Sequence, residues 1–472
     1  LTDAGKEFIY GSRPHEIFFR QLLKFQLPSP YHKEGRKIKG TFWVRPYLEI
    51  IRLIRDLEYL TPDEFRIFAL QLTDYRKYEI VKNQILSFRG EKEKRKGQYK
   101  KFVDEVANQE IFKIYTKEIE TGNIETRETT TSDVKSFIRK EKSNMRDYAD
   151  ACFRYFRFTE MFMSDGRSIR IAPDKIPEID FVLETVPREP AYIDDITAFK
   201  DYLFDAEQPR LYVDDRDNLE NMLMRHFSYT KRELSGKTIN ELKDLRDRSV
   251  QAKRTAIVQK QTEELKSYAL YQEVIDTYNE ILSDEIYDAP LFLEWNTWRA
   301  MTMLDGGSIK GNFKIDDLGR PISTAQGNMP DIECDYGTFA LSVEVTLQRG
   351  QRQYESEGEP VTRHYAQLQK AKGKTTYCLF IAPSINRATW AHFFGLNQIK
   401  NITAYGGKPK IVPLELDSFM RLIENSYTNE GVPHAQEVQN FLQTAIDEIE
   451  NSIDEIDWRK RISACADRWL VA

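Results

Sequence analysis

The segment from residue 331 to residue 347 places the tightest limit on how this chain can fold. Val343 and Val345 alternate with Ser342, Glu344 and Thr346, which is the two-residue period of a strand with one apolar face. A tight turn at Gly337-Thr338 joins this strand to the preceding segment, DIECDY. Pairing across such a turn sets Asp331 nearly opposite Glu344. The sequence therefore predicts two carboxylates side by side on adjacent antiparallel strands.

The elements around this strand pair predict an α/β domain over residues 286–472. A helix leads into short strands, and further helices then alternate with strands, which is the order of a sheet covered by helices. The expected helices are 285–304, 360–373 and 386–396, and the expected strands are 312–316, 331–336, 339–347, 375–382 and 409–416. Beyond them, Ile446, Ile449, Ile453 and Ile456 recur at helical spacing and predict an amphipathic helix over 436–458.

Residues 1–190 read as mostly helical. Pro14 opens one helix, Thr61 caps another whose first residue is Pro62, and a long charged helix is expected over 91–118, followed by a polar loop at 121–132.

A winged helix is the expected fold around residues 132–173. Two helices that break near Ser143-Asn144 are followed by a hairpin that turns at Asp165-Gly166. The opening LTDAGKEF is interpreted as the end of another wing, so that the chain would be truncated at its N-terminus. Residues 191–285 are expected to form a helical linker, in which 238–282 is either one long helix or a helical pair.

Composition excludes several classes of protein and leaves nucleic-acid binding open. No stretch approaches the ~20 apolar residues of a membrane span, and four scattered cysteines without a CxxC pair argue against a zinc ribbon or a disulfide scaffold and fit a reducing cytoplasm. The net charge of -6 hides a segregated distribution, because residues 89–101 hold seven Lys or Arg against two Glu, while 446–457 hold six acids and no base. At about 100–200 residues per domain, 472 residues predict about three domains, placed at 1–190, 191–285 and 286–472.

Asp331 and Glu344 together form a candidate Mg²⁺ site, since Mg²⁺ prefers hard oxygen ligands and keeps several waters. Glu294, in LEWNTWRA on the preceding helix, is a third candidate ligand. The alternatives are a surface acid at Glu294 and edge-strand acids that only prevent aggregation.

A second cluster contains Glu355, Glu357, Glu359, Arg363 and His364, just around Pro360. If Pro360 starts a helix, three acids lie near its positive end, which by itself accounts for them. The functional interpretation assigns one Glu to a metal or a water and has His364 face a scissile phosphate.

Basic residues of the first half are candidate DNA contacts, although a solvated helix face is the usual role of a charge run. The predicted contacts are Lys94, Arg95, Lys96, Lys100 and Lys101 in the basic run, Arg139, Lys142, Arg146 and Arg154 around the expected helix–turn–helix, and Arg167 and Arg170 on the hairpin.

LEWNTWRA, GNMPDIE, VEVT, EPVTRHY and YCLFIAP together resemble the AlwI-type, FokI-like type IIS restriction endonucleases and their nicking relatives, which carry the PD-(D/E)xK motif. The segments LTDAGKEF, KGQYKK and RDYADACFRYFR are similar to the recognition half of that family. The resemblance implies a DNA-recognition part, a linker and a cleavage domain. It assigns Asp331 and Glu344 to the metal-binding acids, Glu294 to the helix acid, and Glu357 and His364 to auxiliary positions.

One position departs from the general motif, because Thr346 stands where a lysine is expected. Gln348, Arg349, Glu357 and His364, or a second metal ion, remain open as the group that activates water.

The expected function is Mg²⁺-dependent hydrolysis of double-stranded DNA outside a short asymmetric site, as a site-specific deoxyribonuclease of class EC 3.1.21. A winged-helix regulator with an inactive nuclease-like domain and a structure-specific repair nuclease are the alternatives. One active site cuts one strand, so a double cut requires a second catalytic subunit or a transient homodimer. A cognate DNA methyltransferase and a bacterial or archaeal cytoplasm complete the expectation, without a membrane.

Overall fold

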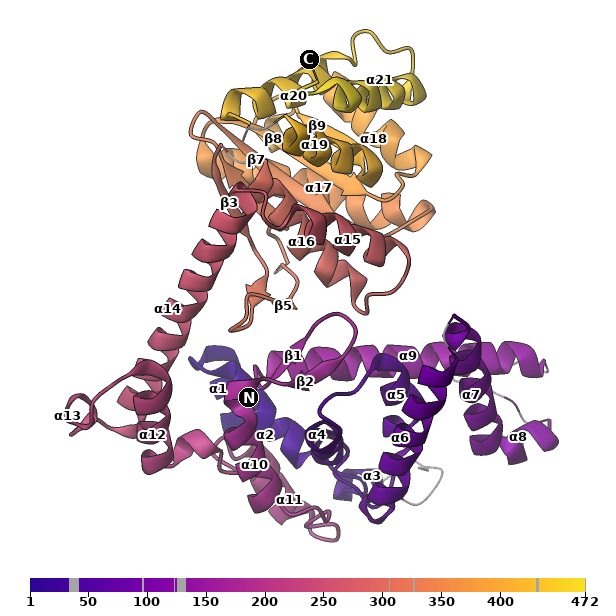
Figure 1. Cartoon of the computed structure of the whole chain (residues 1–472), viewed down its shortest axis with the longest axis vertical. Coiled ribbons are helices and arrows are strands. Elements are labelled where there is room, and N and C mark those ends of the chain that lie inside the picture. The colour runs from indigo at the N-terminus through magenta and orange to yellow at the C-terminus, as the bar shows by residue number, and fades with distance from the viewer. Residues whose placement is uncertain are drawn as a thin grey trace. The chain divides into compact units, whose positions relative to one another are not determined.

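The computed structural model describes residues 1–33, 42–95, 97–122, 124, 133–304, 306–325, 327–429 and 433–471. The chain forms two compact units, Leu1–Val250 and Gln251–Ala472. Helices dominate the first unit, and the second is built on a five-stranded sheet (Figure 1). Within the described residues, no helix is long and apolar enough to cross a membrane.

The first unit consists of helices and one short hairpin. Its helices are α1 (Asp3–Tyr10), α2 (Pro14–Lys24), α3 (Pro30–Lys33), α4 (Pro46–Leu57), α5 (Pro62–Ile67), α6 (Tyr78–Lys94), α7 (Tyr99–Ile114), α8 (Thr116–Glu120), α9 (Val134–Phe158), α10 (Ile176–Thr185), α11 (Ile196–Phe204), α12 (Arg216–Phe227) and α13 (Lys231–Leu234). The strands are β1 (Phe162–Ser164) and β2 (Ile169–Ile171). Helix α14 (Ile239–Lys266) begins in this unit and ends in the next.

The helix starts predicted from capping residues are confirmed. Pro14 is the first residue of α2, and Thr61 caps α5 through a capping box with Glu64. Proline fits the first turn because the amide hydrogen it lacks would have no partner there.

The single helix expected over 91–118 is wrong. α6 ends at Lys94, α7 begins at Tyr99, and Gly97 lies between them with φ +86°. Phe88 and Phe102 stack with ring centroids 5.5 Å apart. In one straight helix these residues would lie roughly 20 Å apart along the axis, so the apolar contact requires the break. The loop predicted at 121–132 lies outside the described residues except for 121, 122 and 124.

The helix–turn–helix expected near Ser143-Asn144 is also wrong, because α9 runs unbroken from Val134 to Phe158. The two ends of this helix bury different faces, since Phe137 packs with Ile111 and Phe153 packs against Phe65, so no break in the helix is needed for both contacts. The opening segment is not the end of a wing, since it forms α1, capped by Thr2. The hairpin itself is confirmed, and its strands β1 and β2 pair antiparallel across the Asp165-Gly166 turn.

The second unit contains the predicted α/β arrangement. Its sheet has the order β3-β6-β7-β8-β9, with β3, β6 and β7 antiparallel and β7, β8 and β9 parallel. The strands are β3 (Ser308–Gly311), β6 (Ile332–Asp335), β7 (Phe339–Val345), β8 (Thr375–Ala382) and β9 (Ile411–Glu415), and β4 (Lys314–Ile315) with β5 (Pro321–Ser323) forms a separate hairpin. The helices are α15 (Tyr271–Leu282), α16 (Ala289–Met303), α17 (Gln351–Lys372), α18 (Arg387–Gln398), α19 (Leu416–Thr428), α20 (Ala435–Asp447) and α21 (Glu455–Arg468).

Helices cover both faces of this sheet. Leu341 and Leu379 meet apolar residues of α16, α19 and α20 on one face. On the other face, Phe380 packs against Phe393 of α18 with ring centroids 5.3 Å apart. The sheet is therefore the middle layer of three.

Three boundaries in the second unit differ from the prediction. Residues 314–315 pair only within the β4–β5 hairpin, and the edge of the sheet is β3, which was not predicted. α17 begins at Gln351 and contains Pro360 in its interior. The tail forms two helices, α20 and α21, because the chain turns at 448–454, where Ile453 is 92% exposed.

All four cysteines are free thiols. Cys152 lies half-buried in the first unit, and Cys334, Cys378 and Cys465 are buried in the second. Burial raises the pKa of the Cys152 thiol to about 11, and it also raises the pKa of Cys334 and Cys378.

Candidate active site

The β6–β7 pair brings Asp331 and Glu344 together, as the sequence predicts. Ile332 pairs with Val343, which sets Asp331, one residue earlier, across from Glu344, one residue later. Asp331 Oδ2 accepts a hydrogen bond of 2.8 Å from the backbone N–H of Val345. Gly337 adopts φ +80° in the connecting turn, a conformation that glycine accepts without steric cost. The turn and the register thus fix the spacing between the two acids.

Glu294 lies in α16 and is 8% exposed, which excludes the surface-acid interpretation. Its Oε2 accepts a hydrogen bond of 2.9 Å from Ala325 N–H. Burial, together with the negative charge of Asp331, raises the pKa of Glu294 to about 8. Glu294 therefore lies near Asp331, in a buried position that favours the neutral form of its carboxyl group.

Glu357 and His364 reach the same cluster from α17. The Thr346 hydroxyl donates to Glu357 Oε1 at 2.8 Å and accepts from Gln348 N–H at 3.1 Å. His364 Nδ1 lies 2.9 Å from Glu344 Oε1. Glu355 and Glu359 are exposed instead. Since Pro360 lies inside α17, the acids around it are not at a helix start, and that account of them is wrong.

The carboxyl groups of the cluster are difficult to ionise together, because they are removed from water and lie near one another. Burial raises the pKa of Asp331 well above its usual value, and the charge of Glu344 adds to the shift. Burial raises the pKa of Glu344 likewise, with contributions from Glu357 and Glu294. Burial lowers the pKa of His364, and the neighbouring Arg363 lowers it further, so the ring is neutral near pH 7.

The donor chemistry of this cluster fits a hard divalent cation. One oxygen each of Asp331, Glu344, Glu294 and Glu357 is hydrogen-bonded, and in the described residues the second oxygen has no hydrogen-bond donor from the chain. Mg²⁺ takes such oxygen ligands together with waters. No three His, Cys, Asp or Glu side chains of the described residues already converge on one metal position, so an ion would complete its shell with waters or with substrate.

Two side-chain amides, the buried Gln353 and the half-buried Asn312, hold the loops around the cluster and were not revealed by the sequence. Gln353 is fully buried, donates to Gln348 O at 2.8 Å and Ser384 O at 3.0 Å, and accepts from Asn386 N–H at 2.7 Å. Asn312 donates its backbone N–H to Asp331 O at 2.9 Å and its side-chain amide N–H to Pro330 O at 2.8 Å. Both positions read as ordinary polar residues in the sequence.

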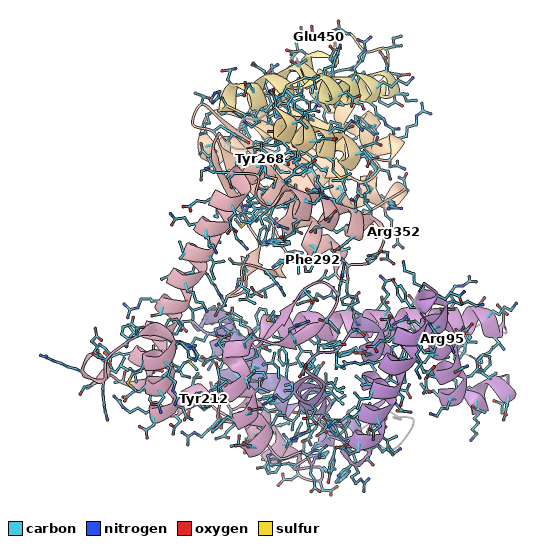
Figure 2. All side chains as sticks on the ribbon, in the orientation of Figure 1. Arg95, Tyr212, Tyr268, Phe292, Arg352 and Glu450 are labelled. Atoms are coloured by element: carbon cyan, nitrogen blue, oxygen red, sulfur yellow. The ribbon has the colours of Figure 1, made fainter. Side chains whose placement is uncertain are left out.

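The predicted DNA contacts are scattered over the first unit. The exposed members are Lys94, Arg95 (labelled in Figure 2), Lys100, Lys101, Arg139, Arg146, Arg154 and Arg167. Several basic side chains have acidic partners within the chain, among them Lys94 with Glu91 at 2.8 Å, Lys142 with Asp104 at 2.5 Å and Arg170 with Asp165 at 3.2 Å. Lys96 lies outside the described residues.

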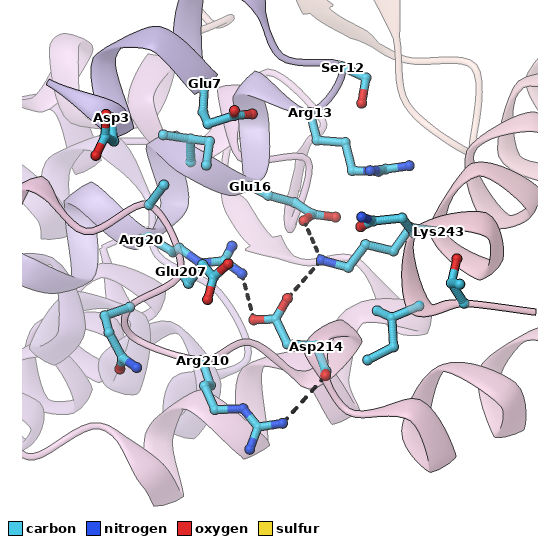
Figure 3. A pocket seen from close by; sticks show the side chains of 16 residues that line it. Asp3, Glu7, Ser12, Arg13, Glu16, Arg20, Glu207, Arg210, Asp214 and Lys243 are labelled. Carbon is cyan, nitrogen blue, oxygen red and sulfur yellow. Dashed lines mark hydrogen bonds and ion pairs between the residues drawn. The ribbon is translucent and has the colours of Figure 1, made fainter. Parts of the chain in front are cut away.

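A cavity of about 800 Å³ lies in the first unit (Figure 3). Asp214 stands between Arg20 and Lys243, and Lys243 also bonds Glu16 at 3.0 Å. Burial alone would raise the pKa of Glu16, but Arg246 and Lys243 hold it well below its usual range. None of the predicted catalytic residues lines this cavity, and the ion pairs in its wall join α2 to the start of α14.

The fold and the cluster together define a multidomain α+β protein with an acidic, enzyme-like site on its mixed sheet. The sequence model of the AlwI restriction endonucleases matches residues 1–422, and the chain belongs to this family of site-specific DNA endonucleases. Among solved structures, the small subunit of the heterodimeric restriction endonuclease R.BspD6I is similar at 26% identity with a TM-score of 0.35, over 41% of this chain and 98% of that one. No curated protein matches.

Proposed function

We propose that this restriction endonuclease is of type IIS and uses Mg²⁺ to hydrolyse a phosphodiester outside a short asymmetric recognition site. The observation that carries the proposal is the carboxylate cluster of half-buried Asp331 with buried Glu344 and Glu294, whose pKa values are raised by burial and by the negative charges of the neighbouring acids. A divalent cation compensates that charge, and a nuclease needs one where a phosphate is attacked.

Asp331, Glu344 and Glu294 are the residues that would surround the ion, with waters between the ion and any of these acids that does not bind it directly. When bound, Mg²⁺ supplies a Lewis acid and lowers the pKa of water. Glu357, fixed by Thr346, lies beside these acids and helps to shape the shell. His364 turns one ring nitrogen to Glu344, and its buried Nε2 has no hydrogen-bond partner in the described residues, so that nitrogen can accept a proton from water.

The proposed division of labour follows the three zones of the sequence. Residues 1–190 recognise double-stranded DNA through exposed Arg and Lys side chains, 191–285 act as a linker, and 286–472 cut. One active site per chain breaks one strand, so a double cut needs a second catalytic subunit or a transient homodimer. A cognate DNA methyltransferase would protect the host DNA, and the proposed location is the cytoplasm of a bacterial or archaeal cell.

The test is Asp331→Asn assayed on supercoiled plasmid with Mg²⁺. The amide has lost the charge that a cation needs, so we expect binding in a mobility-shift assay and no cleavage. Asp335→Asn is the matched control, because Asp335 lies at the other end of β6 and pairs with Lys374. Equal cleavage by Asp331→Asn and wild type contradicts the assignment.

The same digest separates the remaining alternatives. Open-circular product identifies a nicking enzyme, and linear product identifies double-strand cleavage. Binding without cleavage, with or without a chelator, identifies a DNA-binding regulator. Preferential cutting of branched DNA over a linear duplex identifies a repair nuclease.

A further inference from the structure

The carboxylate cluster contains no cation from its own strands. Thr346 occupies the position at which the general nuclease motif has lysine, and its hydroxyl is committed to Glu357 and to Gln348 N–H. A phosphodiester that enters this cluster brings further negative charge. Some positive side chain must therefore reach the substrate from another element.

Arg363 is placed to do so. It directly precedes His364 in α17, and the His364 ring nitrogen Nδ1 lies 2.9 Å from Glu344 Oε1, so Arg363 is next to a residue that contacts the cluster. Its Nε donates to Glu359 at 3.0 and 3.3 Å, and one terminal nitrogen donates to Asn328.

The guanidinium of Arg363 is held by two of its nitrogens and, among the described residues, keeps one terminal nitrogen free. Asn328 lies three residues before Asp331, so the contact ties α17 to the loop that leads into β6. The side chain is still 37% exposed, and its second terminal nitrogen makes no hydrogen bond in the described residues. Glu359 is 70% exposed and neutralises the guanidinium only in part because of solvent screening.

We propose that Arg363 binds a non-bridging oxygen of the phosphate in the active site and supplies the positive charge that a lysine at position 346 would supply. The inference rests on the proposed nuclease function and names a further substrate contact for it. The free terminal nitrogen can donate to a phosphate oxygen, and the guanidinium stays charged throughout the reaction. Its fixed position means that the charge is already oriented when the negative charge on the phosphate grows.

The test compares Arg363→Met and Arg363→Lys with wild type in single-turnover cleavage of plasmid DNA with Mg²⁺. We expect Arg363→Met to lose roughly 100-fold in rate, with plasmid binding unchanged, and Arg363→Lys to retain part of the rate. Arg352→Met is the matched control, because Arg352 is an exposed arginine of the same helix (Figure 2). Added methylguanidinium is expected to restore part of the rate of Arg363→Ala.

Two further variants separate substrate contact from a purely structural clamp. Asn328→Ala and Glu359→Gln each remove one anchor and leave the guanidinium in place, so we expect cleavage within roughly threefold of wild type. If either loses as much rate as Arg363→Met, or if Arg363→Met cuts like wild type, the inference is overturned. If wild type cuts no plasmid, the nuclease proposal itself has failed, which is a distinct outcome.

Discussion

The side-chain hydroxyl of Thr346 holds the carboxylate of Glu357 in position. Its hydrogen bond of 2.8 Å is the contact that fixes Glu357 relative to β7. We predict that Thr346→Val lowers the single-turnover cleavage rate by roughly fivefold, since the bond contributes about 1 kcal/mol and Glu357 would otherwise adopt several rotamers. The free energy of unfolding should change by less than about 1.5 kcal/mol.

Thr346→Ser retains the hydroxyl and is the control for that measurement. It should cut at nearly the wild-type rate. A valine variant that cuts as fast as the serine variant would show that the position of Glu357 does not matter for the reaction.

The sequence predicted the site residues whose positions are set by the pairing of two neighbouring strands. It did not predict those whose partners lie far away along the chain. Asp331 and Glu344 lie on two strands joined by one short turn, so alternation and turn position were sufficient. Gln353 instead joins backbone groups of residues 348, 384 and 386, which come together only in the folded unit. No local pattern marks such a glutamine. Arg363 was noticed only as a neighbour of His364, because its contact to Asn328 spans 35 residues.

Among the elements, the strands of the sheet were predicted more accurately than the helix boundaries. β8 covers residues 375–382 as expected, because a buried strand between two helices is a continuous apolar run. Pro360 misled the prediction of α17, since proline marks a helix start more often than an interior position. The breaks after α6 and within the tail depend on which apolar side chains meet in space, as Phe88 and Phe102 do.

One element-scale prediction concerns the end of α11, which is held by a buried lysine. Lys24 is fully buried and donates to the carbonyls of Leu203 and Asp205. Burial lowers its pKa to about 8, from 10.5 when unfolded. Between these values the unfolded chain binds a proton that the folded chain does not, so this lysine makes the first unit more stable as pH rises from 8 to 10.5.

The check is urea unfolding of wild type and Lys24→Met at pH 7 and at pH 10. The difference in free energy of unfolding should move in favour of wild type at pH 10, by up to ~3 kcal/mol. Both proteins contain the same tyrosines, which titrate in the same pH range. Subtracting one free energy of unfolding from the other therefore removes the contribution of the tyrosines. A difference that stays flat between the two pH values would contradict the role of Lys24.

For the whole molecule, two compact units with separate cores predict two unfolding transitions in calorimetry. Ile54 in α4 and Phe419 in α19 are both fully buried, one in each unit. Replacing either by alanine leaves a cavity and costs about 3 kcal/mol. Ile54→Ala should lower the midpoint of one transition only, and Phe419→Ala that of the other. A single transition that both variants shift equally would mean that the units unfold together.

The four cysteines are natural probes for following these unfolding events. The first unit holds one thiol, Cys152, which is half-buried and has a raised pKa. The second unit holds three thiols that are buried and therefore protonated and out of reach of reagents while that unit is folded. The number of thiols that react with a maleimide therefore shows which unit has unfolded, and no dye has to be introduced. DNA or a divalent cation that slows the labelling of one group of thiols would thereby reveal which unit it binds.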